Sequence, residues 1–214
     1  MKRFIFSLIL LLCTGLVFAQ SAYESTMTKK IHELENTNNP DSLTALSNDF
    51  LRIGEKEKTK WLPYYYASLS TIQKGRIAMQ MGKMDELESA AELAQTYLDK
   101  ATAISADNAE IYILSKMIHT LKLMINPVVT YATEGPLAEE ALQKAEKLDP
   151  ENPRITLLKA EDAYFTPENF GGDKKKGLEL FKKALKQFDE YSPETALSPN
   201  WGKEEAAHFI KMAE

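Results

Sequence analysis

The chain has 214 residues, of which 44% are hydrophobic and 27% charged, and its 31 acidic and 26 basic residues give a formal net charge of −5. A chain of this length can bury a substantial core, so one core and one domain suffice. The acidic balance argues against nucleic-acid binding, because contacts to a phosphate backbone need clustered positive charge.

The N-terminus has the layout of a cleaved secretory signal. Lys2 and Arg3 form a short positive region, and an almost unbroken apolar run covers residues 4–17. Val17-Phe18-Ala19 then places small or modest side chains, Val17 and Ala19, at the −3 and −1 positions of a cleavage point after Ala19. The run is too short to span a bilayer comfortably, and an uncleaved anchor is the alternative.

We therefore expect residues 1–19 to be a signal peptide and residues 20–214 a single domain, periplasmic or secreted. Cleavage removes two basic residues, which leaves 24 basic against 31 acidic residues and a net charge of −7. It also removes Cys13, the one cysteine, so the mature chain contains no disulfide. A lipoprotein anchor at Cys13 is disfavoured, because such sites need a small residue where Leu12 stands. No later stretch predicts a transmembrane span.

Glycine and proline fall at the boundaries of segments whose apolar residues recur with helical spacing. No alternating strand pattern persists between these boundaries. The spacing predicts helices over about residues 22–36, 40 through at least 53, 59–81, 84–105, 108–125, 136–148, 152–165, 174–188 and 203–212.

We also expect specific local structure at three places in the chain. Asn126-Pro127 and Gly135-Pro136 should bracket an irregular insertion or a broken helix. Gly171-Gly172 should form a tight turn that lets Phe170 pack inward. At least one residue of Tyr64-Tyr65-Tyr66 should face the core, since neighbours on a helix point about 100° apart.

A pattern of six matching positions occurs twice at the seams between predicted helices. The first copy runs from Lys100-Ala101 to Ile111 and the second from Lys144-Ala145 to Ile155. A weaker third copy begins at Lys183-Ala184. Such self-similarity is typical of stacked helix pairs, in which each unit buries its apolar side on its neighbour.

These segments resemble tetratricopeptide repeats. Ile111, Leu114, Ser115 and Ile118 follow the spacing of that family's first helix, although an aromatic residue is replaced by Ile118. In the second helix Ala145 and the following Leu148-Asp149-Pro150 also match. The resemblance covers about residues 60–190 and implies an all-α stack of antiparallel helix pairs, an α-solenoid, closed by a C-terminal capping helix.

The equivalent alanines depart from the family in spacing. Ala101 and Ala145 lie 44 residues apart, and Ala145 and Ala184 lie 39 apart, whereas an ordinary unit has about 34 residues. The sequence is thus similar to a divergent repeat protein with insertions. Motifs such as Asn152-Pro153-Arg154 and Phe170-Gly171-Gly172 are similar to those of secreted bacterial repeat-like proteins.

The sequence contains few groupings of residues that could support catalysis or bind a metal ion. Glu205 and His208 form a Glu-x-x-His pair, which serves dimetal sites only when a second copy converges on it, and none exists. No Gly-x-Ser-x-Gly turn or phosphate-binding loop is present. We therefore predict that the protein is not an enzyme and has no metal or cofactor.

The sharpest binding hypothesis concerns the helix predicted over residues 108–125. Tyr112, Lys116 and His119 recur at i, i+4 and i+7 and share a face, and Lys122 flanks them. In the resembled family these offsets point into a concave groove. Arg154 is a further candidate contact. The alternative is a polar helix edge with snorkelling lysine stems, and a salt-bridged turn residue at Arg154.

The sequence thus favours a non-catalytic interaction scaffold of the periplasm or envelope, which binds a peptide or partner protein in its concave groove. The alternative is an exported small-molecule binding protein associated with a transporter. A deep pocket lined by Tyr131, Tyr164 and Trp201 would favour that alternative.

Overall fold

The computed structural model describes residues 22–213, and these contain helices and no strand. The predicted signal peptide at residues 1–19 lies outside the described part. After a first helix over residues 22–35, the chain forms α2 (Pro40–Glu57), α3 (Leu62–Gln80), α4 (Met84–Thr102), α5 (Ala109–Ile125), α6 (Pro127–Leu148), α7 (Pro153–Phe165), the short 3₁₀ helix η1 (Glu168–Phe170), α8 (Lys174–Glu190) and α9 (Lys203–Ala213).

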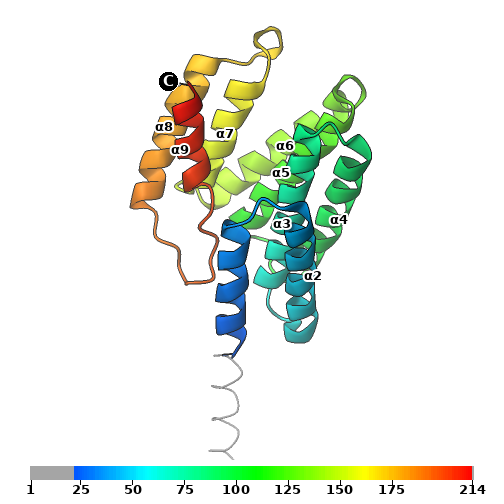
Figure 1. Ribbon diagram of the computed structural model, residues 1–214. Coiled ribbons are helices and arrows are strands. Elements are labelled where there is room, and N and C mark those ends of the chain that lie inside the picture. The colour runs from blue at the N-terminus through cyan, green and yellow to red at the C-terminus, as the bar shows by residue number, and fades with distance from the viewer. Residues whose placement is uncertain (1–21, 214) are drawn as a thin grey trace, which may run out of the picture.

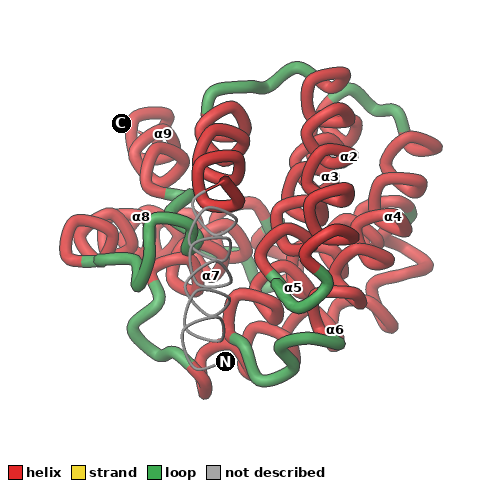
Figure 2. Tube along the Cα trace, turned by 90° about the horizontal axis from the view of Figure 1, so that it is seen from below, coloured by secondary structure: helices red, strands yellow, loops and turns green. Residues whose placement is uncertain are grey.

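Successive helices pack as antiparallel pairs, α3 with α4, α5 with α6 and α7 with α8, and α9 packs on α8 at the end of the stack (Figure 1). This confirms the predicted fold class, including the terminal helix. The α7–α9 unit and the α5–α6 pair diverge from a common base (Figure 1), and the view from below places α7, α8 and α9 together on one side (Figure 2).

The buried apolar residues form two clusters. The larger runs from the first helix to α7, and the smaller lies between α7, α8 and α9 around Phe181 and Phe188. Trp201, in the segment before α9, packs against both clusters and so joins the C-terminal unit to the rest. Among residues 22–213, no helix combines the length and apolarity that a membrane span requires.

The repeated sequence pattern marks equivalent structural positions. The side chains of Asn108 and Asn152 cap α5 and α7 by accepting hydrogen bonds from the backbone N–H of Glu110 and Arg154, at 3.0 and 3.1 Å. Ala101 and Ala145 are fully buried near the ends of α4 and α6. The duplicated segments therefore do form successive layers.

The irregular segment expected between residues 126 and 136 is absent, and that prediction was wrong. One helix, α6, begins at Pro127 and continues through Pro136. A proline disfavours helical geometry in the residue before it largely by contact with that residue's Cβ. The residue before Pro136 is Gly135, which has no Cβ, so the helix can pass through.

At least one residue of Tyr64-Tyr65-Tyr66 was expected to face the core. This prediction is confirmed, and all three tyrosines are buried.

The prediction that Phe170 packs inward was wrong, since 67% of this residue is exposed. The turn after it is tight for another reason: a Cβ at Gly172 would lie 1.7 Å from the carbonyl oxygen of Thr166.

Candidate functional site

The predicted binding face of α5 lies along the edge that meets α6 and α7. Tyr112 is half-buried, with the ammonium of Lys144 5.7 Å from its ring centroid. Lys116 is buried, and its Nζ lies 2.6 Å from Oδ1 of Asp162 on α7. The predicted residues thus share one face of α5, but Lys116 is buried in an internal ion pair with Asp162.

His119 and Lys122 occupy the outer part of the same face. The Nδ1 atom of His119 lies 2.7 Å from Oε2 of Glu134 on α6, and the imidazole is largely but not fully buried. Lys122 is partly exposed and makes no ion pair with any described residue. These two side chains, with Tyr112, are the members of the predicted set that remain partly accessible.

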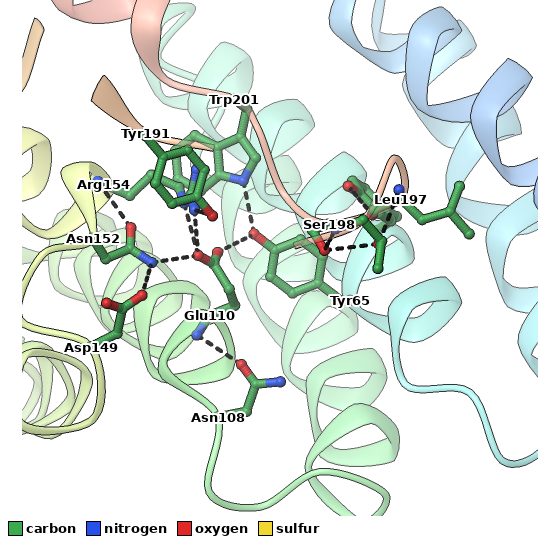
Figure 3. A network of polar contacts seen from close by, with 12 residues as sticks. Tyr65, Asn108, Glu110, Asp149, Asn152, Arg154, Tyr191, Leu197, Ser198 and Trp201 are labelled. Carbon is green, nitrogen blue, oxygen red and sulfur yellow. Dashed lines mark hydrogen bonds and ion pairs between the residues drawn. The ribbon is translucent and has the colours of Figure 1, made fainter. Parts of the chain in front are cut away.

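Arg154 is fully buried and lies away from that face, at the start of α7. Its Nε and Nη2 atoms donate to Oε1 of Glu110 at 2.9 and 2.6 Å, and the side chain of Asn152 donates to the same oxygen at 2.7 Å (Figure 3). The carboxylate holds the pKa of Arg154 above its ordinary value, against the opposing effect of burial. The geometry is that of a salt-bridged turn residue; a role in binding stays a prediction.

The same network extends to the C-terminal segment. The hydroxyl of Tyr65 donates to Oε2 of Glu110 at 2.9 Å and accepts a hydrogen bond from Nε1 of Trp201 at 2.8 Å (Figure 3). Tyr191 accepts from Arg154 at 2.9 Å, and its ring lies over the guanidinium at 4.8 Å. Burial raises the pKa of Tyr65 well above its usual range, so the phenol remains a donor to the carboxylate.

A second charged cluster joins α3, α7 and α9. Arg76 lies 3.1 Å from Glu161 and 2.6 Å from Glu205, and Lys116 contributes a further positive charge nearby. Burial raises the pKa of Glu161 to about 7, although Arg76 opposes this effect. These ion pairs tie α3 to α7 and α9.

The aromatic trio expected to line a pocket is dispersed. Trp201 bonds to Tyr65, Tyr164 packs edge-on against Phe181, and Tyr131 lies 59% exposed on the first turns of α6. Two open hollows lie elsewhere. One, of about 470 Å³, lies between the first helix and α2, and the other, of about 340 Å³, is lined by α2, α3 and α4.

The turn between α5 and α6 carries exposed apolar side chains. Val128 is 95% exposed, Val129 68% and Met124 38%. We call these three residues, together with Tyr131 and Lys122 on either side of them in the sequence, the α5–α6 corner. The hydroxyl of Thr130 ties the corner together by donating to the carbonyl oxygen of Leu123 at 2.8 Å. Apolar groups this exposed are typical of contact surfaces when they gather at one place.

Sequence reasoning missed Glu110, Trp201 and Glu134 as polar partners. Glu110 and Arg154 each lie two residues after a repeated asparagine, so the repeat register was a signal that could have paired them. Within residues 22–213, no three His, Cys, Asp or Glu side chains gather to hold a metal ion.

No protein-family model matches the chain, and no curated protein matches it. Among solved structures it is similar to the HusA haemophore from Porphyromonas gingivalis, with 28% sequence identity and a TM-score of 0.77. The match covers 90% of this chain and 92% of the other. A haemophore binds its ligand, so the likeness supports a binding role for this helical fold rather than a catalytic one. Membership of the tetratricopeptide family stays a prediction.

Proposed function

We propose that this protein is an exported, non-catalytic binding protein whose ligand is haem or a closely related porphyrin. The observation that carries the proposal is the likeness, over nine-tenths of both chains, to a haemophore. This is the small-molecule alternative that the sequence left open, with the ligand class now named.

The α5–α6 corner supports the proposal chemically. Haem is an apolar disc that carries two carboxylates at one edge, so a surface for it needs apolar and aromatic side chains beside a cation. Val128 and Tyr131, three residues apart on α6, share a face and supply the first, and Lys122 supplies the second, without an ion pair among residues 22–213 to compete for it.

The direct test is titration of the chain from Gln20 onward with haemin and, separately, with iron-free protoporphyrin. We expect saturable binding of both, seen as a shift of the Soret band and as quenching of tryptophan fluorescence. Failure of both porphyrins to bind would overturn the proposal.

The corner is tested by the double variant Val128→Ser with Val129→Ser. Loss of apolar contact should weaken protoporphyrin binding about tenfold, since each buried methylene contributes about 0.8 kcal/mol. The matched control is Ile104→Ser with Leu148→Ser, two exposed apolar residues at the opposite end of the helix pairs. The control should bind as the unchanged protein does.

Export is part of the proposal. We propose cleavage after Ala19 and a periplasmic or secreted mature protein. N-terminal sequencing of the protein recovered from the envelope or medium should begin at Gln20; a retained leader would favour an N-terminal anchor.

The interaction scaffold remains the second candidate, favoured by the partial exposure of Tyr112, His119 and Lys122 on one face. A peptide would contact these three, because Lys116 and Arg154 are occupied by internal ion pairs. Affinity purification from envelope extracts tests this idea: capture of a specific protein that His119→Ala with Lys122→Ala abolishes would support it.

A further inference from the structure

The turn between α7 and α8 exposes two aromatic side chains and leads into the sequence's only run of three basic residues. Phe165, the last residue of α7, is 54% exposed, and Phe170 of η1 is also exposed. The first turn of α8 consists of three exposed lysines, none of which makes an ion pair with another residue of the range 22–213. We call this set the α7–α8 tip: Phe165, Phe170, Lys174, Lys175 and Lys176.

Backbone contacts hold the two parts of the tip against each other. The N–H of Asp173 donates to the carbonyl oxygen of Ala163 at 2.8 Å, and Gly177 packs against Tyr164. The three lysines lie between these two contacts, so the first turn of α8 flanks the last turn of α7. This turn lies at one end of the α7–α9 unit, at the top of Figure 1.

The backbone around Phe170 is fixed in a specific shape. The N–H groups of Phe170 and Gly172 both donate to the carbonyl oxygen of Pro167, at 2.9 and 3.2 Å, and Gly171 between them has a positive φ of 93°. The phenyl ring is therefore held toward solvent by the turn itself. Exposure of such a ring to water is unfavourable, and contact with an apolar phase relieves it.

The lysines stand where a helix disfavours positive charge. The N-terminus is the positive end of the helix dipole, and the first turn of α8 contains no acidic residue. The acids of this turn are Glu168 and Asp173, and Oδ1 of Asp173 accepts a hydrogen bond from the backbone N–H of Lys176 at 2.9 Å. Positive charge is thus concentrated at this end of an otherwise acidic chain, where it can meet an external anion.

We propose that the α7–α8 tip docks the protein on an anionic lipid surface, with Phe170 entering the boundary between headgroups and acyl chains. Apolar side chains combined with lysines bind such surfaces through apolar burial and through attraction to anionic headgroups. The chain from Gln20 onward has a net charge of −7. The rest of the molecule is therefore repelled, and the tip is the part that faces the lipid.

The small size of the tip favours lipid over an acidic protein as the partner. A standard protein–protein interface takes about 20–30 residues from each side. The tip consists of one short turn and the first turn of one helix, which is far less. A lipid surface needs only a few apolar side chains, because lipid molecules move aside to fit them.

The test measures binding of the chain from Gln20 onward, without porphyrin, to sedimented vesicles. One set contains phosphatidylcholine alone, and the other contains phosphatidylcholine with an equal amount of phosphatidylglycerol. We expect binding to the anionic vesicles to be at least about tenfold tighter and to weaken as salt screens the lysines. Binding to neither set, or equal binding to both, would refute the proposal.

Two variants examine whether the tip is the part that binds. Phe170→Ala should lower the affinity for anionic vesicles about tenfold, because apolar burial is lost. Lys174→Gln with Lys175→Gln should lower it about tenfold as well and reduce its dependence on salt. All three side chains are exposed, so these variants should fold as the unchanged protein does.

The matched controls lie on other elements. Leu148→Ala shortens an exposed apolar side chain at the end of α6, and Lys56→Gln with Lys147→Gln makes the same change in net charge on α2 and α6. Both controls should bind anionic vesicles as the unchanged protein does. If they lost as much affinity as the tip variants, binding would not depend on the tip.

A tryptophan at the turn separates insertion from adsorption by charge alone. Lipids brominated on their acyl chains should quench Phe170→Trp more strongly than Leu148→Trp or the unchanged protein, which carries Trp61 and Trp201. Equal quenching in all three would show that the ring does not enter the lipid.

One further outcome would reassign the surface. If the vesicles were not bound and an envelope protein were captured in a way that Phe170→Ala abolishes, the tip would be a protein interface and not a lipid-binding surface. None of these measurements uses a porphyrin, so the proposed function is tested separately.

Discussion

The pairing of Glu110 with Arg154 shows what a sequence repeat does at the level of single residues. Each follows its capping asparagine by two positions, and the side chains at the starts of α5 and α7 reach one another at these equivalent positions. Opposite charges at equivalent positions then meet in the interior. A buried pair of this kind is costly to break, because removal of one partner leaves the other charge without compensation.

Arg154→Met should therefore destabilise the protein by about 3–5 kcal/mol. The double variant Arg154→Met with Glu110→Gln should recover much of that loss, because no buried charge remains. Urea unfolding followed by tryptophan fluorescence measures both. Equal losses in the single and double variants would show that the charge pair is not what stabilises this site.

Tyr65→Phe removes a hydroxyl that donates to Glu110 and accepts from Trp201. Because both partners stay buried or partly buried, the expected loss is about 1–3 kcal/mol. The same unfolding assay applies, with Tyr131→Phe as the exposed control. If Tyr65→Phe lost no more unfolding free energy than Tyr131→Phe, the hydrogen bonds of Tyr65 would not contribute to stability.

The helices were largely predictable from the sequence because capping residues, prolines and apolar spacing act locally. Asn39, Asn108 and Asn152 cap α2, α5 and α7 by hydrogen bonds to residues two or three positions on. The partners Asp162, Glu134 and Trp201 could not be predicted in the same way, since each lies 15 to 136 residues from the side chain it contacts.

At the scale of elements, α8 approaches α7 closely at Gly177. A Cβ at Gly177 would lie 2.6 Å from Cβ of Tyr164 and 2.8 Å from its backbone nitrogen. Because backbone cannot move aside as a flexible side chain can, Gly177→Ala should push the helices apart.

We expect Gly177→Ala to cost about 1–3 kcal/mol by overpacking, despite the better helix propensity of alanine. A thermal melt checks this. An unchanged or raised Tm would mean that the α7–α8 interface relaxes freely.

Replacement of Pro136 should have the opposite effect on stability. It lies exposed inside α6, where it removes a helical N–H, so Pro136→Ala should stabilise the protein by up to about 3 kcal/mol. A lowered Tm would instead show that the proline is required for the shape of α6.

For the whole molecule, the charged cluster on α3, α5, α7 and α9 makes stability depend on pH. The folded-state pKa of Glu161 is raised to about 7, whereas an unfolded glutamate titrates near 4.3. The folded state therefore holds this proton more tightly. Its stabilising contribution is complete below about pH 4 and is lost as the pH rises through about 7.

Comparison with Glu161→Gln isolates this contribution. Between pH 5 and pH 8 the free energy of unfolding of the unchanged protein should fall by roughly 1–3 kcal/mol relative to the variant. Parallel pH profiles for the two proteins would contradict the raised pKa.

The segment between α8 and α9 has a consequence for how the chain matures. Leu197 accepts a hydrogen bond from Tyr66 and Trp201 donates one to Tyr65, across 131 and 136 residues. In a regular solenoid, terminal units can be deleted one at a time, because each touches only its neighbours. Here Leu197 and Trp201, which follow α8, complete the interior around α3. The earlier helices therefore reach their final packing only once this late segment has joined them, so removal of the segment should loosen α3 as well as its own neighbours.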